Sequence, residues 1–344
     1  MSSIYQFTLK QLENELLQLH QKPFRAKQIY EWLYEKNVYD FNQMTNIAKA
    51  LRETLAATFS TDLLSIEDKQ VSTDGTIKYL LKLDDGGLIE TVLMIHPYGR
   101  SLCVTSQLGC NMGCRFCASG LLKKQRNLAS HELMRQVLTV AQDTGERISH
   151  VVIMGTGEPF DNYDEVMNFV HTINEPKGLA IGARHITVST CGLVEGIRRL
   201  EDESLQINLA ISLHASNDEV RNELMPINKA YPMDRLREAM AHYIKATNRR
   251  VTLEYILLKD VNDDVKYARQ LAHYLRGLNA YVNLIPYNAV NELGYSKTSD
   301  EKIQQFKDEL LRLHINCTLR KEHGSDIDGA CGQLRAKRSG GEGR

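Results

Sequence analysis

The sequence predicts an α/β fold whose centre is a parallel sheet of six strands, preceded by a small helical domain and a β-hairpin. Three patterns predict this fold. From about Tyr98 onward, strand-like runs alternate with helical runs, whereas residues 8–65 show apolar residues at helical spacing. Between them, Asp68 to Ile95 alternates with a period of two. Successive strand and helix units favour parallel strands joined by right-handed crossovers.

Residues 1–65 are expected to form a helical accessory domain. Thr8 fits the N-cap position of its first helix, because leucines follow at helical spacing. Two further apolar patterns, around Trp32 and from Ile47 to Leu55, predict a second and a third helix. No residues in this segment have the spacing of catalytic or metal-ligating groups, so the residues themselves assign it no chemistry.

Residues 66–97 are expected to form a β-hairpin that connects the two larger parts of the chain. Alternating residues from Tyr79 to Leu83 and from Ile89 to Ile95 flank the turn-forming segment 84–87. Glu90 interrupts the apolar pattern of the second strand. Its simplest interpretation is a strand residue that faces solvent.

Residues 98–320 carry the six strand and helix pairs. The expected strands are Leu102–Ser106, His150–Met154, His185–Ser189, Asn208–Ser212, Val251–Leu257 and Tyr281–Ile285. A curved sheet of this kind fits an open, partial barrel of the TIM type, (βα)6, in which ligands bind at the carboxyl ends of the strands. Residues 321–344 are expected to form a loop rich in glycine and acidic residues, followed by a flexible tail.

The composition is that of an ordinary globular protein, with 42% hydrophobic and 25% charged residues in a chain of 344. No apolar run is long enough to span a membrane and no signal peptide is visible, so a cytoplasmic protein without a membrane partner is expected. Seven cysteines in such a chain favour reduced thiols and ligands over disulfides. A net charge of −1 does not indicate a nucleic-acid partner, although basic clusters at 123–126 and 335–338 could provide a contact.

Cys110, Cys114 and Cys117 form the pattern C-x3-C-x2-C directly after the first expected barrel strand. Three thiolates on one loop can each bind one iron of a cubane 4Fe-4S cluster, which leaves the fourth iron open to a small molecule. The amino and carboxylate groups of S-adenosylmethionine (SAM) can chelate such an iron. A structural zinc site is the alternative, and it would need a fourth Cys or His ligand nearby.

This cysteine pattern, with Phe116 before the last cysteine, resembles the signature of the radical SAM superfamily. The resemblance implies the partial barrel, a 4Fe-4S cluster on the three cysteines, and SAM at the strand ends. Taken singly, each polar or glycine residue at a strand end is as well explained by a cap or a turn. The residues that match SAM-contacting positions of the superfamily are Gly157, Glu158, Ser189, Ser212, Leu213, His214 and Asn288.

From the hairpin to Gln333 the chain is similar to the RlmN and Cfr family of RNA adenosine methyltransferases. The motifs that carry this similarity are Gln107-x-Gly-Cys110, Gly157-Glu158-Pro159, Ser212-Leu-His214, Met225-Pro-Ile-Asn228, Val282-Asn-Leu-Ile-Pro286 and Asp326-Ile-Asp328. The resemblance implies a mechanism with two cysteines and two SAM molecules per turnover. Cys331 would carry a methyl group, Cys103 would release the product through a transient disulfide, and Glu90 would accept a proton.

Within that family, Leu108, Pro159 and the ending 331–337 resemble members that methylate C2 of adenine rather than C8. The implied substrates are an adenosine of 23S rRNA at the peptidyl-transferase centre and the adenosine 3′ of the anticodon in some tRNAs. Residues 1–65 would bind RNA. An external electron donor such as flavodoxin would reduce the cluster. The enzyme would be a monomer. Gly120 and Gly329 depart from the family pattern and could alter the fit of the substrate.

Three other functions stay open at this point. They are C8 methylation of the same rRNA adenosine, a radical SAM reaction on a small molecule or protein, and a zinc-stabilised RNA-binding protein without catalysis. The pair of Cys103 and Cys331 argues against the second function, whereas a loop with three ligands does not by itself exclude the third. Cys191 and Cys317 are interpreted as buried thiols without a role.

Overall fold

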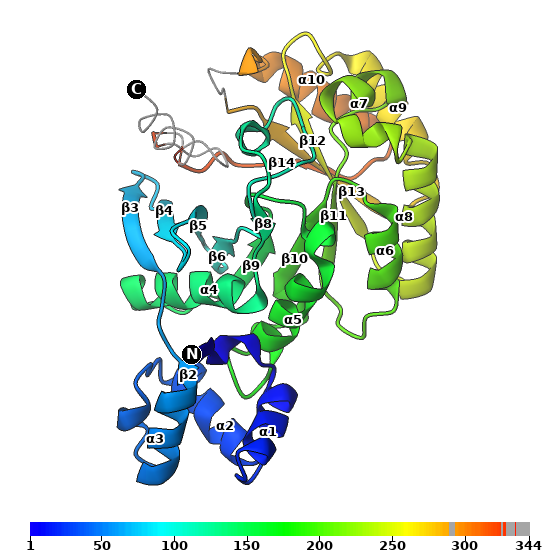
Figure 1. Cartoon of the computed structure of the whole chain (residues 1–344). Helices are drawn as coiled ribbons and strands as arrows, with labels where there is room; N and C mark the ends of the chain where they lie inside the picture. Colours follow the sequence, from blue (N-terminus) through cyan, green and yellow to red (C-terminus); the bar gives the residue numbers. More distant parts are fainter. Residues whose placement is uncertain (289–292, 325, 328–333, 335–344) are drawn as a thin grey trace.

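The computed structural model describes residues 1–288, 293–324, 326–327 and 334, and it shows a helical domain below an open α/β barrel (Figure 1). The elements of the helical domain are β1 (Ser2–Ser3), η1 (Ile4–Gln6), α1 (Leu9–Gln18), α2 (Arg25–Tyr30), the π-helix η2 (Glu31–Glu35), η3 (Phe41–Gln43), α3 (Lys49–Thr58) and β2 (Phe59–Ser60). β1 and β2 pair in parallel, so the two ends of the domain meet.

Thr8 caps α1 as predicted. Its Oγ1 accepts a hydrogen bond from the Gln11 N–H at 3.3 Å, and its own N–H donates to Gln11 Oε1 at 2.7 Å. This reciprocal pair satisfies two of the backbone groups that a helix start leaves open. The domain is held to the barrel helices by polar contacts as well, because Asn168 Nδ2 donates to the Gln6 carbonyl at 2.9 Å.

One sheet of ten strands runs through the rest of the molecule. In spatial order its strands are β14 (Cys317–Leu319), β13 (Ala280–Pro286), β12 (Val251–Leu257), β11 (Asn208–Ser212), β10 (Ile186–Thr190), β9 (His150–Ile153), β6 (Gly99–Cys103), β5 (Leu88–His96), β4 (Ile77–Lys82) and β3 (Ser65–Val71). The strands from β6 to β14 pair in parallel, whereas β3 to β6 pair antiparallel.

All six predicted parallel strands are present, but the prediction of the sheet was incomplete. It missed β14, which has three residues, and β3, which has no buried side chain and so shows no apolar face. The predicted hairpin β4–β5 forms, yet it is not a separate connector. β5 pairs with β6, with Val92 opposite Cys103, so the hairpin continues the barrel sheet.

Helices cover the outer face of the sheet (Figure 1). They are α4 (Ser130–Thr144), α5 (Tyr163–Asn174), α6 (Val194–Glu201), α7 (Asp218–Leu224), α8 (Met233–Thr247), α9 (Val265–Tyr274) and α10 (Asp300–Arg312). The short elements between them are β7 (Gln107–Leu108), η4 (Ala118–Leu121), β8 (Arg126–Asn127), η5 (Pro159–Asn162), η6 (Ala183–His185) and η7 (Pro226–Lys229).

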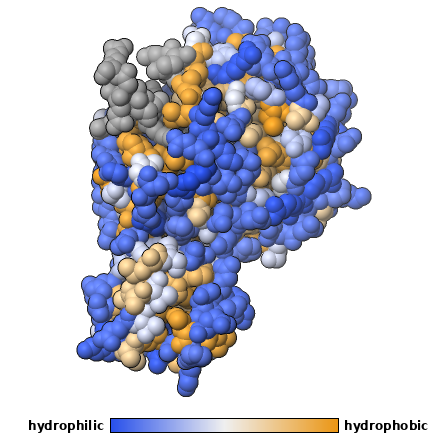
Figure 2. All heavy atoms as spheres, in the orientation of Figure 1, coloured by the Kyte–Doolittle hydropathy of each residue, from blue (hydrophilic) through white to orange (hydrophobic). Residues whose placement is uncertain are grey.

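The apolar core lies between these helices and the outward side chains of the strands, such as Val188, Leu209 and Leu253. The face seen in Figure 2 is largely hydrophilic, as expected when apolar side chains are buried. Among the described residues, no helix combines the length and the apolar character that crossing a membrane requires.

The inward side chains of the barrel are the ones that can reach a ligand. Because side chains alternate along a strand, β10 turns Thr187 and Ser189 inward, and β12 turns Thr252 and Glu254 inward. Ser189 lines a cavity at the carboxyl ends of the strands, whereas Thr187 lines a cavity at their amino ends. The barrel therefore has two ends with different linings.

Candidate active site

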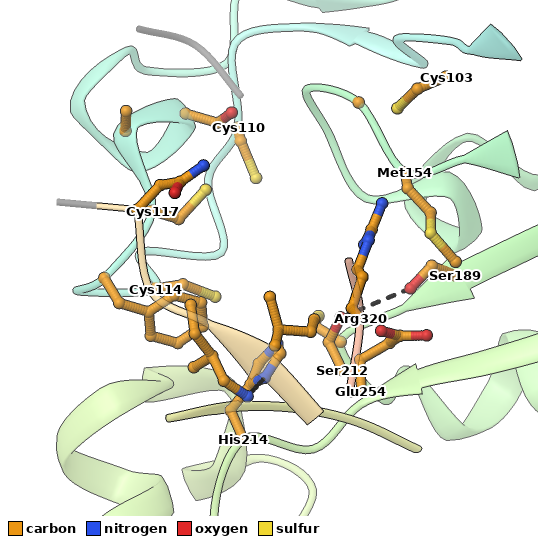
Figure 3. A pocket seen from close by; sticks show the side chains of 18 of the residues that line it. Cys103, Cys110, Cys114, Cys117, Met154, Ser189, Ser212, His214, Glu254 and Arg320 are labelled. Carbon is orange, nitrogen blue, oxygen red and sulfur yellow. Dashed lines mark hydrogen bonds between the residues drawn. The ribbon is translucent and has the colours of Figure 1, made fainter. Parts of the chain in front are cut away.

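A cavity of about 350 Å³ lies at the carboxyl ends of the parallel strands and collects most of the predicted site residues (Figure 3). The predicted residues that line it are Cys103, Cys110, Cys114, Cys117, Gly157, Glu158, Ser189, Ser212, His214 and Asn288. They come from loops and strand ends far apart in the sequence. Their meeting at one place follows from the parallel sheet, whose carboxyl ends all open on the same side.

The loop with the three cysteines is held in shape by backbone contacts. The Cys110 N–H donates to the Leu122 carbonyl at 2.9 Å, and the Cys117 N–H donates to the Cys114 carbonyl at 3.2 Å. Gly109 has a φ of 88°, and a Cβ there would lie 2.1 Å from the Lys123 carbonyl oxygen. Only glycine fits that position. Burial raises the pKa of the Cys114 thiol, and its neighbours Cys117 and Cys110 add to this effect.

The arrangement of the three thiols fits a 4Fe-4S cluster. In the described part of the chain, no three His, Cys, Asp or Glu side chains are placed so that they could hold a metal ion. The thiols instead line one side of an open cavity in Figure 3. A cubane binds each thiol at a different iron, whereas tetrahedral zinc needs all its ligands around one point. The three thiols share one wall of the cavity, as the ligands of a cluster with one open iron would.

Gly157 and Glu158 form the wall beside the cysteine loop. Gly157 has a φ of 113°, and a Cβ there would lie 2.7 Å from Gln107 Cβ, so a larger residue would clash. Glu158 is buried, and its carboxylate accepts the backbone N–H groups of Cys191 at 2.7 Å and Phe160 at 3.0 Å. Burial raises the pKa of Glu158. The carboxylate thus fixes the wall of the cavity in addition to lining it.

Ser189, Ser212 and His214 lie on the side of the cavity formed by β10 and β11. The two serine oxygens are 3.5 Å apart (Figure 3). His214 Nδ1 accepts the Ile256 N–H at 3.1 Å, and its ring meets the edge of Phe116 with 4.7 Å between ring centroids. Burial lowers the pKa of His214 to about 3. The imidazole is therefore neutral, and Nε2 carries its proton.

Three of the predicted residues do not line this cavity. Leu213 is fully buried, and its side chain packs in the hydrophobic core. Glu90 lies on β5, on the same face as the cavity residues Val92 and Met94. Cys331 lies outside the described residues.

The interpretation of Glu90 as a solvent-facing residue is wrong. Glu90 is buried, and its Oε2 lies 2.9 Å from Nζ of Lys78, which is also buried. The two side chains come from neighbouring strands, β4 and β5. Such a pair is costly to bury and is retained where its geometry is needed. The pair therefore holds the Glu90 carboxylate in place.

The chain leading to Cys331 is anchored on the turn between β3 and β4. The Gly324 N–H donates to Asp74 Oδ2 at 3.1 Å, and the carboxylate of Asp326 accepts the Thr73 N–H at 2.9 Å. Asp326 belongs to one of the motifs noted above. Its contacts give that motif a structural reason, because they fix the segment that precedes the predicted catalytic cysteine.

Sequence reasoning missed Cys191, Glu254 and Arg320, which also line the cavity. Cys191 is buried as expected, but in the cavity wall. Glu254 is buried on β12 and accepts a hydrogen bond from Asn283 Nδ2 at 2.9 Å. Burial raises its pKa, and Arg320 opposes that effect. An acid within an apolar strand was the available signal, for Glu254 as for Glu90.

Arg221 does not line the cavity, but it forms hydrogen bonds with residues of the cavity wall and their neighbours. It is fully buried, and its guanidinium donates to the Cys191 carbonyl at 2.7 Å, to Asn228 Oδ1 at 2.7 Å and to the Leu213 carbonyl at 3.3 Å. Asn228 ends the Met-Pro-Ile-Asn motif. That motif therefore contributes to the scaffold under the site.

Comparisons with known proteins agree with this geometry. Residues 3–60 match the family model described as the ribosomal RNA large subunit methyltransferase N-terminal domain, and residues 104–272 match the radical SAM superfamily. A probable dual-specificity RNA methyltransferase RlmN from Spiroplasma citri is 53% identical over 99% of both chains. The protein of that name from Staphylococcus saprophyticus is 54% identical over 97% of this chain and 93% of its own.

A solved structure is similar over almost the whole chain. It is a radical SAM methyltransferase from Sphaerobacter thermophilus, with a TM-score of 0.92 and 42% sequence identity. The match covers 97% of this chain and 99% of the other. The similarity thus extends over both the helical domain and the barrel.

Proposed function

This chain belongs to the RlmN family of radical SAM RNA methyltransferases, and from that membership we propose that it methylates C2 of an adenosine in 23S rRNA. The adenosine 3′ of the anticodon in some tRNAs is a second substrate. The observation that carries the proposal is the position of Cys103. It lines the same cavity as the three cysteines of the loop, and it lies across from them in Figure 3.

Cys110, Cys114 and Cys117 would hold the 4Fe-4S cluster, and the wall from Gly157 to Ser212 would hold SAM. When bound, these groups supply a 5′-deoxyadenosyl radical that can take a hydrogen atom from a methyl group. On this side of the cavity His214 is neutral and its ring contacts the apolar ring of Phe116, so neither side chain adds a charge. Reduction requires an external donor, for which flavodoxin is our candidate.

In the proposed reaction, Cys331 carries the methyl carbon to adenine and Cys103 releases the methylated product. Cys331 would accept a methyl group from one SAM, lose a hydrogen atom from that methyl group to the 5′-deoxyadenosyl radical of a second SAM, and bond through the same carbon to adenine C2. The adduct would give up its C2 proton to the base and one electron to the cluster. Attack of the Cys103 thiolate on the sulfur of Cys331 would then break the carbon–sulfur bond and form a disulfide, and the released carbon would take up one proton to become the methyl group. Adenine C2 is electron-poor, so direct attack on the SAM methyl group is not open to it.

Glu90 accepts the proton that C2 must lose before release. Its burial beside Lys78 supports this role, because the ion pair holds the carboxylate in one position on the inward face of β5. Val92, on the same face, pairs with Cys103. The proposed base and the proposed resolving thiol therefore lie on adjacent strands. Glu90→Gln should accumulate the covalent RNA adduct, and rapid product formation by this variant would remove Glu90 from the mechanism.

Anaerobic turnover on an rRNA fragment with mass analysis of the modified base tests the reaction. We expect 2-methyladenosine. Methylation at C8 would reassign the enzyme to the Cfr type, and SAM cleavage without any RNA product would favour a small-molecule or protein substrate. Iron and labile sulfide should accompany the protein after reconstitution, whereas stoichiometric zinc alone would end the radical mechanism.

Variants that lack one of the two proposed catalytic cysteines should stop at different steps of the reaction. Cys331→Ala should abolish methylation of both enzyme and RNA, because no methyl carrier remains. Cys103→Ala should instead become trapped on its RNA, since addition can occur but release cannot. Cys317→Ala is the matched control, because Cys317 is a buried thiol on β14 that does not line the cavity. Normal turnover by Cys103→Ala would contradict its role.

A further inference from the structure

A second cavity, of about 850 Å³, lies at the amino ends of the same strands. The loops before β10, β11 and β12 form its rim, and the first inward residues of those strands form its walls. Among its lining residues are Arg184, Thr187, Asn208, Arg249, Arg250 and Thr252. Met154 and Glu254 line both cavities, so the two adjoin inside the barrel.

The amino-end cavity has an excess of positive charge. Three arginines line it, and Glu254 is the only acidic residue among the lining residues that the structure describes. Glu254 is already hydrogen bonded to Asn283 and faces Arg320 at the boundary with the other cavity. Burial and the nearby Arg184 lower the pKa of Arg249. Arg184 and Arg249 thus line the same cavity, and within the described residues neither forms a salt bridge with a carboxylate.

Arg249 is also incompletely bonded. Its Nη2 donates to Asn208 Oδ1 at 3.3 Å, whereas its buried Nη1 has no hydrogen-bond partner in the described part of the chain. A buried donor without an acceptor is unfavourable, because it has lost its hydrogen bond to water. Because Arg249 also lines the cavity, its guanidinium is available to an acceptor that enters there. The donors and charges together suit an oxyanion with several acceptor atoms.

We propose that the amino-end cavity binds phosphodiester groups of the substrate RNA, through Arg184 and Arg249. The inference rests on the proposed function only in taking RNA as the substrate. The position of the amino-end cavity supports the proposal. Thr187 and Ser189 line the two cavities and are two residues apart on one strand, which is about 7 Å. Arg184 itself precedes Ser189 by five residues, which is about 17 Å of extended chain, so a phosphate held at the amino end would lie about two to three nucleotides from the reaction cavity.

A row of aromatic rings beside Arg184 extends this surface. His185 stacks on His150 with 4.2 Å between ring centroids, and His150 meets the edge of Tyr98 at 5.2 Å. Tyr98 in turn stacks on His96 at 4.7 Å and is 67% exposed. These rings stand where β6, β9 and β10 begin. Exposed rings next to a cationic groove are the elements by which proteins hold single-stranded RNA.

The test measures RNA binding by the full chain without SAM, by fluorescence anisotropy of a labelled rRNA hairpin at several salt concentrations. Arg184→Gln and Arg249→Gln should each weaken binding about 3- to 30-fold and reduce the slope of log affinity against log salt by about 1. Arg249→Lys should restore part of the affinity. Arg312→Gln is the matched control, because Arg312 on α10 is paired with Glu309 and should bind as wild type does.

Arg184 is exposed, so its variant tests the proposal even if an Arg249 variant folds poorly. Unchanged affinity and salt slope in Arg184→Gln and Arg249→Gln would overturn the proposal, even if the wild-type enzyme methylates RNA. Conversely, weakened binding by both variants supports it even if methylation proves to occur at C8. Competition by inorganic phosphate distinguishes the sources of the anion: if phosphate binds but RNA affinity is unchanged in the variants, the cavity takes a free ion and the proposal fails.

Discussion

Each end of the barrel contains a distinctive arginine, fully buried at the carboxyl end and half-buried at the amino end, and the two arginines differ in how they are bonded. Arg221, beneath the carboxyl-end cavity, donates to two backbone carbonyls and to Asn228 at 3.3 Å or less. Arg249, at the amino end, has one weak side-chain partner and a buried nitrogen without one in the described chain. The first arginine is part of the scaffold, whereas the second has bonding capacity left for a ligand.

The same contrast separates the linings of the two cavities. At the carboxyl end the imidazole of His214 is neutral and burial raises the pKa values of the Cys114 thiol and the Glu158 carboxyl group. At the amino end guanidinium groups dominate. The carboxyl-end cavity contains charges of both signs, because Arg320 and Lys321 line it together with Glu158 and Glu254, whereas the cationic lining of the amino end favours a polyanion. The inward side chains of the same strands thus line two cavities that differ in charge.

The largest expected effect separates chemistry from binding. Cys110→Ala should reduce RNA methylation below detection, because the cluster loses a ligand, while RNA affinity stays within about twofold of wild type. Iron content, methylation and anisotropy of the same preparations measure this. A parallel loss of RNA binding, absent in Cys317→Ala, would show that the two ends are not independent.

A smaller effect concerns stability. Arg221→Met should lower the free energy of unfolding by about 3–5 kcal/mol, because Asn228 and two buried carbonyls lose their donor. Arg249→Met should cost less than about 1 kcal/mol, since it removes one weak hydrogen bond and a strained cation. Urea unfolding of both variants measures the difference. Equal losses would abolish the distinction between a scaffold arginine and a ligand arginine.

The smallest effect comes from His214. Its pKa is about 3 in the folded chain and about 6.5 when unfolded, so the unfolded state binds more protons as the pH falls below 6.5. The free energy of unfolding should therefore decrease as the pH is lowered from 6.5, and at pH 5 the loss from this residue should be about 2 kcal/mol. His214→Asn should remove that part of the loss in protein prepared without the cluster. Identical pH profiles would show that the pKa of His214 is not lowered by folding.

Much of the molecule could be predicted from local patterns. The six parallel strands follow from the alternation of strand and helix periodicities, and the N-cap at Thr8 follows from a local capping pattern. Most of the predicted strand-end residues do line one cavity. These features are readable because each depends on neighbours in sequence, and a parallel sheet gathers its strand ends by topology alone.

Other features were decided only in three dimensions. Glu90 is buried because β4 brings Lys78 to it, and β5 joins the barrel because it pairs with β6. Leu213 turns into the core, although it lies between two residues that line the cavity. The sequence by itself determined the family, the periodicities and the cysteine pattern. The tertiary structure decided which polar groups pair and which keep bonding capacity, because pairing depends on strands that are distant in sequence and adjacent in space.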